Sequence, residues 1–273
     1  MFLTWGLAFY GKKIGSNLAA VSNGVMASVL FPDMLIYACI GSYSGMTDLS
    51  SGIPVIYIAL ATCVSALCFE SYGLFAGRGG RLGTSAFLAN IIANTVAYGA
   101  NPQVVTSSFF WDPNIASYAL LSGDVVCTVL FGNLLGVCVT YLCRYVRPLL
   151  SPVTAGNASS MLLIIILDSL FATFTTEATR SEAAGSILQG SFVGMSSLII
   201  LPNIGSVLIS GLLSACVTLL LYPLFPSGIG GKRGFMAFVA VHLFLWLCQL
   251  RQIAITAYRV KFTEPLSESQ RHT

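Results

Sequence analysis

Two aspartates in apolar surroundings are the residues whose type most directly suggests chemistry. Asp168 lies inside the apolar run 162–174, and Asp33 directly follows Pro32. A carboxylate in apolar surroundings is costly unless it is paired, solvated or protonated. We therefore expect Asp168, and with it Asp33, to couple protons or cations to a transport step. The alternative is a carboxylate that caps or cross-links helices near an interface, which Pro32 favours for Asp33 because proline marks a helix boundary.

A short glycine motif occurs twice in the chain. Gly41-Ser42-Tyr43-Ser44-Gly45-Met46-Thr47 returns as Gly190-Ser191-Phe192-Val193-Gly194-Met195-Ser196. Glycine lets a helix unwind, and an unwound helix in a membrane requires protein or water to satisfy its freed amides. Both segments therefore predict a short or broken helix with binding groups for a solute or ion at Gly41, Ser42, Thr47, Gly190, Ser191 and Ser196. Close packing of helices through small residues is the alternative.

A second repeated motif is basic. Gly79-Gly80-Arg81-Leu82-Gly83 returns as Gly230-Gly231-Lys232-Arg233-Gly234, and each copy opens an apolar run. The backbone amides, the positive helix end and the side chains of Arg81, Lys232 and Arg233 could converge there on an anion. Contact with lipid phosphates is the alternative, because basic residues at the ends of membrane helices anchor them.

The two motifs recur in the same order, which predicts an internal duplication. We expect a first membrane repeat over 1–98, a connecting aromatic loop and linker helix over 99–138, a second membrane repeat over 139–258 and a polar C-terminal tail over 259–273. Asp33 and Asp168 correspond in this alignment. Four crossings per repeat would make the halves parallel and five would make them antiparallel, so both orientations stay open.

The composition sets the class of protein. Apolar residues make up 56% of the chain and charged residues 8%, and the mean hydropathy is +0.83. Several apolar runs approach the length that crosses a bilayer; they are 53–76, 82–98, 118–143, 159–175, 204–225 and 235–248. We predict an all-α, polytopic integral membrane bundle of about eight to ten helical elements, with short or broken helices at the glycine motifs.

Duplicated apolar chains are typical of membrane transporters, whose sites lie between the repeats. We therefore predict a secondary carrier or channel of the inner or plasma membrane that moves a small solute or ion. The alternative is a non-catalytic scaffold subunit of a larger complex. We expect no enzyme activity, cofactor or metal, since no cluster has catalytic or metal-ligand spacing. Expected partners are the lipid bilayer, the solute or ion, and a second copy or a membrane-complex partner, but no nucleic acid.

Overall fold

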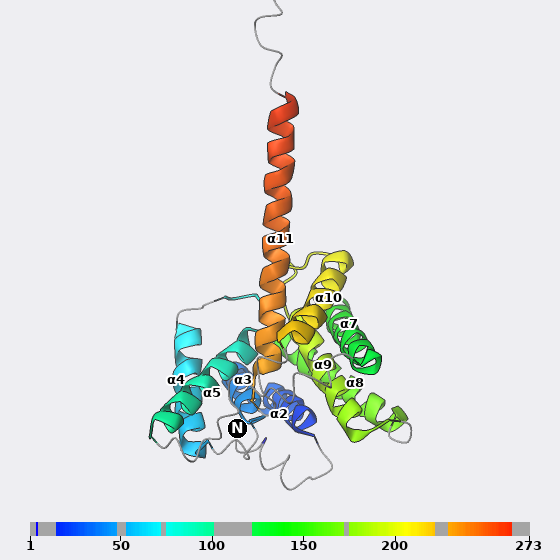
Figure 1. Ribbon diagram of the computed structural model, residues 1–273. Helices are drawn as coiled ribbons and strands as arrows, with labels where there is room; N and C mark the ends of the chain where they lie inside the picture. The colour runs from blue at the N-terminus through cyan, green and yellow to red at the C-terminus, as the bar shows by residue number, and fades with distance from the viewer. Residues whose placement is uncertain are drawn as a thin grey trace, which may run out of the picture.

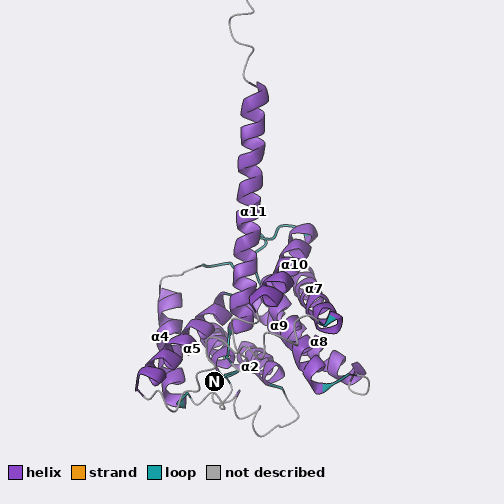
Figure 2. Cartoon of the chain, viewed as in Figure 1, coloured by secondary structure: helices purple, strands orange, loops and turns teal. Residues whose placement is uncertain are grey.

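The computed structural model describes residue 4 and residues 15–47, 53–71, 75–100, 122–171, 175–221 and 229–263. Helices dominate these residues, and no strand occurs among them (Figure 2). The predicted aromatic loop within 99–138 lies outside the described residues, as does the predicted tail from residue 264 onward. The described part of the chain agrees with the all-α prediction.

The helices form two groups along the chain, before and after residues 101–121 (Figure 1). The first group is α2 (Ser16–Leu30), the 3-10 helix η1 (Pro32–Met34), α3 (Leu35–Ser44), α4 (Val55–Ser71) and α5 (Arg81–Ala100). The second group is α7 (Gly123–Val146), α8 (Pro152–Phe171), α9 (Glu177–Gly194), α10 (Ile204–Leu221) and α11 (Lys232–Thr263).

Local sequence explains where the helices of the second group begin. Ser122, Ser151, Thr176 and Asn203 precede α7, α8, α9 and α10, and each side-chain oxygen accepts a backbone N–H from the first turn at 2.9–3.4 Å. Such capping residues satisfy amides that have no partner inside the helix. The four helix starts are therefore determined by residue type.

Among the residues that the structure describes, four helices are long and apolar enough to cross a membrane. Their apolar segments are Gly123–Val146, Pro152–Leu170, Ile204–Leu221 and Lys232–Ile253. Each overlaps one of the runs that the sequence predicts. The apolar segment Val55–Phe69 in α4 is shorter. These spans support a membrane protein.

The spans place polar side chains inside the bundle and apolar ones outside, as α10 shows. Ser210, Ser214 and Thr218 are fully buried, whereas Leu212 is 43% exposed and Leu220 is 73% exposed. A water-soluble core would place these residues the other way round. Small and hydroxyl-bearing residues at helix contacts with apolar residues facing outward are expected in lipid.

The glycine motifs lie at the C-terminal ends of two helices. The backbone is helical through Gly41 in α3 and through Gly190 in α9, and the helices end with Ser44 and Gly194. With 10 residues, α3 is about 15 Å long, half the thickness of the hydrocarbon core. The prediction of a short helix therefore fits α3, whereas α9 has 18 residues and is continuous.

Gly190 lets α9 pack closely against α7. An added Cβ at Gly190 would overlap the carbonyl oxygen of Asn133, and one at Gly136 would overlap that of Ile187. Elsewhere α2 packs against α8, and α5 against α11. In Figure 1, α11 begins in the middle of the bundle and then extends well beyond the other helices.

Arg144 of α7 caps the C-terminal end of α9. Its guanidinium is buried and donates to the carbonyl oxygens of Gly194, at 2.9 Å, and Ser196. Arg144→Gln is expected to lower the free energy of unfolding by about 2 kcal/mol, because two buried carbonyls would lose a charged donor. Thermal unfolding in detergent measures this loss. Arg147→Gln at the exposed end of α7 is the control, and an equal loss in both variants would contradict the capping role.

Candidate functional site

The two glycine-rich turns each contact the end of the distant motif helix. The Gly79 N–H donates to Ser196 Oγ at 2.9 Å, and the Gly230 N–H donates to Thr47 Oγ1 at 3.0 Å. Both hydroxyls are buried. Thr47 and Ser196, which the sequence predicts to bind a solute, therefore hold each turn against the opposite half of the chain.

The turns are crowded by the crossing of α5 and α11. Gly80 and Gly231 have φ angles of +80° and +83°, in the left-handed region that favours glycine. An added Cβ at Gly83 would lie 2.5 Å from Cα of Gly234. The first turns of the two helices thus meet backbone to backbone, which glycine alone permits.

Two aromatic rings from the repeated motif meet beside this crossing. The ring centroids of Tyr43 and Phe192 are 4.9 Å apart in an edge-to-face arrangement. The Tyr43 hydroxyl donates to Asn157 Oδ1 at 2.9 Å, and Asn157 Nδ2 contacts Cys39 Sγ at 3.3 Å. Both rings are buried. The hydrogen bond from Tyr43 therefore fixes the aromatic pair against α8.

A first cavity, here the central cavity, lies against this pair and has a volume of about 180 Å³. Residues of α2, α3, α9 and α11 line it, and the charged ones are Glu182, Lys232 and Arg233. Lys232 is 9% exposed and Arg233 is 7% exposed. These side chains belong to the interior of the bundle, where charge is costly and needs partners.

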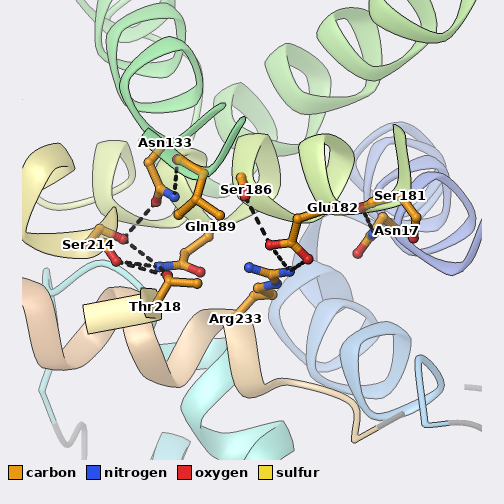
Figure 3. Close-up of polar contacts among 10 residues, drawn as sticks. Asn17, Asn133, Ser181, Glu182, Ser186, Gln189, Ser214, Thr218 and Arg233 are labelled. Atoms are coloured by element: carbon orange, nitrogen blue, oxygen red, sulfur yellow. Dashed lines mark hydrogen bonds and ion pairs between the residues drawn. The ribbon is translucent and has the colours of Figure 1, made fainter. Parts of the chain in front are cut away.

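Arg233 and Glu182 form a buried ion pair. Arg233 Nη2 lies 2.7 Å from both carboxylate oxygens of Glu182 (Figure 3). The two side chains are 9% and 16% exposed. Ser186 Oγ adds a long hydrogen bond of 3.5 Å to the same carboxylate. The pair joins α9 to the start of α11 across the central cavity.

The polar side of α9 continues into a network without charge. Gln189 Nε2 donates to Ser214 Oγ at 2.8 Å and to Thr218 Oγ1 at 2.5 Å, and Ser214 Oγ donates to Asn133 Oδ1 at 2.9 Å (Figure 3). All four side chains are fully buried. This network links α7, α9 and α10, and within the described residues it leaves the buried Gln189 Oε1 without a hydrogen-bond partner.

A second cavity, the turn cavity, also lies against Phe192 and has a volume of about 140 Å³. The Gly77–Leu82 segment forms one wall, with Arg78 and Arg81. Arg81 Nη2 donates to the carbonyl of Phe69 at 2.8 Å. Phe192 lines both the turn cavity and the central cavity, so a single ring lies against both.

A third cavity, the outer cavity, adjoins the central cavity and has a volume of about 410 Å³. Asn17 and Ser181 line both of these cavities, and Asn17 Nδ2 lies 3.5 Å from the Ser181 carbonyl oxygen. Asp168 and Arg180 face the outer cavity as an ion pair with a 3.1 Å separation. The Asp168 side chain is 59% exposed, so this pair differs from the buried pair of Glu182 and Arg233.

The remaining predicted site residues lie apart from the three cavities. Asp33 is exposed in η1 and lines none of them. Gly41 lines an apolar groove between α3 and α4. Ser42 is buried in α3, and Ser191 Oγ donates to the Leu188 carbonyl of its own helix at 2.7 Å. The structure brings Lys232 and Arg233 together in one cavity, and it places Arg81 in another.

Sequence reasoning missed Glu182, Arg78 and Gln189. Glu182 and Gln189 precede Gly190 on the same helix at a spacing that places them on one side. That periodicity was the available signal for a polar side of α9. Arg78 directly precedes Gly79, and no pattern in the sequence separates it from an anchoring residue. Comparison with family models, with curated proteins and with solved structures finds no match to this chain.

Proposed function

We propose that this chain is a membrane transport protein, a secondary carrier or channel that moves a small solute or ion between two related repeats. The observation that carries the proposal is the series of three cavities. The outer and central cavities share Asn17 and Ser181, and the central and turn cavities share Phe192. Charged side chains line all three inside a bundle with apolar spans, and charges in such places mark solute pathways.

Matching contacts in the two halves support the duplication. Gly79 corresponds to Gly230 in the two repeats, and Ser196 corresponds to Thr47. Gly79 donates to Ser196 and Gly230 donates to Thr47, so each glycine turn contacts the motif helix of the other repeat. A further pair supports the alignment upstream. Asn23 Nδ2 lies 2.6 Å from Thr4 Oγ1, and Ser159 Oγ lies 2.6 Å from Thr140 Oγ1, with a sequence separation of 19 in both cases.

The central and turn cavities occupy corresponding positions of the proposed repeats. The central cavity is lined by Met46 and Gly231, and the turn cavity by their counterparts Met195 and Gly80. Two equivalent cavities that share the Phe192 ring as part of their lining suit alternating exposure of one site. We propose that the α5–α11 crossing is the pivot and that Tyr43 and Phe192 separate the two sides.

The coupling role falls to Asp168. Its pairing with Arg180 at the outer cavity supports exchange of a proton or cation at the entrance of the path. Asp33 is exposed outside the cavities, so we do not assign the role to it. The burial of Lys232 and Arg233 favours contact with a solute over contact with lipid phosphates. We propose an inner or plasma membrane location, where helical bundles are found.

The junction of the outer and central cavities provides a direct test. Purified protein in liposomes is expected to carry at least one solute when vesicle swelling is followed in salts and neutral solutes. Ser181→Trp should abolish this flux, because the indole would fill the junction. Ala178→Trp, at an exposed position in the first turn of α9, is the matched control and should keep it.

Two results would contradict transport. One is equal flux in Ser181→Trp and Ala178→Trp, since the path would then not pass the junction. The other is the absence of flux for every solute together with a partner recovered in equal amount from native membranes. That second result would favour the scaffold subunit.

A further inference from the structure

Arg78 is held in an unusual way at the wall of the turn cavity. Its Nη1 lies 2.8 Å from His242 Nε2, and His242 Nδ1 lies 2.8 Å from the carbonyl oxygen of Phe238. A carbonyl can only accept, so Nδ1 carries the hydrogen, and Nε2 then accepts from the guanidinium. His242 is therefore neutral and orients Arg78 without cancelling its charge.

The other contact of Arg78 is also neutral. Its guanidinium carbon lies 5.4 Å from the ring centroid of Phe75. Within the described residues, no carboxylate pairs with Arg78, and none lines the turn cavity. The positive charge of Arg78 thus faces a cavity that contains no described negative charge.

The backbone that carries Arg78 is strained. Phe75 has a φ angle of +58°, in the left-handed region that residues other than glycine rarely adopt. The Phe75 ring packs edge-on against Phe238 and His242, with centroid distances of 5.0 and 5.6 Å. Backbone strain that the surrounding packing enforces is common at ligand-binding sites, where it holds a side chain in position.

From these contacts we propose that the turn cavity binds a small soluble oxyanion through Arg78, with His242 as the positioning residue. A guanidinium offers two parallel N–H donors that match a carboxylate, nitrate or phosphate. The first turn of α5 adds its positive end at the same wall. The cavity volume of about 140 Å³ suits a small ion. This inference rests on the proposed transport function and names its substrate class.

Binding to the purified full chain in detergent tests the site without requiring transport. Sodium nitrate, acetate and phosphate are titrated at constant ionic strength against sodium gluconate, and the melting temperature is followed. At least one salt is expected to raise it in a saturable way. Arg78→Gln should weaken that binding by about tenfold or more. Arg78→Lys should weaken it less, because lysine keeps the positive charge but lacks the two parallel N–H donors of the guanidinium.

The positioning role of His242 has its own readout. His242→Leu removes the acceptor and should weaken anion binding, whereas His242→Gln offers its side-chain oxygen to Arg78 and should restore most of it. Arg147→Gln, which removes an exposed arginine that does not line the turn cavity, should bind as the native chain does. Circular dichroism and size-exclusion profiles that match the native chain verify that each variant is folded.

The outcomes separate this inference from the proposed function. Unchanged binding in Arg78→Gln, or no saturable effect of any of the salts, would overturn the oxyanion site even if liposomes show flux of a cation or neutral solute. Stabilisation by short-chain phosphatidic acid alone would also overturn it, because the ligand would then be a lipid headgroup. Saturable, Arg78-dependent binding without flux of any solute would support the site and contradict transport.

Discussion

Gly231→Ala and Gly80→Ala are each expected to lower the free energy of unfolding by about 3 kcal/mol or more. The left-handed φ angles of +83° and +80° cost alanine roughly 1–2 kcal/mol. The added Cβ would also meet backbone: it would lie 2.5 Å from the Gly83 carbonyl oxygen in the first variant and overlap that of Gly234 in the second. Overpacking against atoms that cannot rotate away adds about 1–3 kcal/mol.

Gly99→Ala is the matched control for this prediction. Gly99 lies near the end of α5, where nothing is within 4 Å of an added Cβ, so alanine should stabilise by about 0.4–1 kcal/mol. Thermal or denaturant unfolding in one detergent compares the three variants. If Gly231→Ala and Gly80→Ala unfold like the native chain, α5 and α11 do not cross as closely as described.

Glu182→Gln is expected to cost about 3–5 kcal/mol of stability, since it removes the carboxylate that pairs with the buried Arg233 guanidinium. The two side chains are 16% and 9% exposed and 2.7 Å apart, so little water can replace the carboxylate. Loss of this contact should also release the start of α11 from α9. The solute flux that we propose to pass through the central cavity is expected to fall with it.

Two further variants make the Glu182 prediction specific. Asp168→Asn removes a carboxylate whose side chain is 59% exposed, and such pairs contribute about 0–1 kcal/mol. The double change Glu182→Gln with Arg233→Met removes both charges and should recover much of the stability that Glu182→Gln loses. A double variant less stable than Glu182→Gln would contradict the pairing as the cause.

The helical class and the spans could be predicted because they depend on local composition. Runs of apolar residues of sufficient length cross a bilayer whatever their neighbours are. Four of the predicted runs overlap helices that are long and apolar enough to do so. Capping residues such as Ser122 and Thr176 set helix starts in the same local way.

The roles of the glycine motifs could not be predicted to the same depth. The repeated motif indicated that Gly190 and Ser196 are structurally or functionally important. It could not decide between their roles, because glycine occurs both in unwound binding sites and in close helix contacts. The structure shows close packing of Gly190 against Asn133 and a hydrogen bond from Gly79 to Ser196. Both partners lie far away in sequence, so the choice depended on the packing of helices.

The two carboxylates Asp168 and Glu182 show which properties follow from the sequence and which depend on tertiary structure. By itself the sequence determined that this chain is helical and suited to a membrane, because hydropathy and capping act over a few turns. It drew attention to Asp168 through its apolar neighbours, yet only the tertiary structure placed that carboxylate at an exposed rim and buried Glu182 against Arg233. Burial depends on which side of a helix faces another helix, and Glu182 and Arg233 are 51 residues apart.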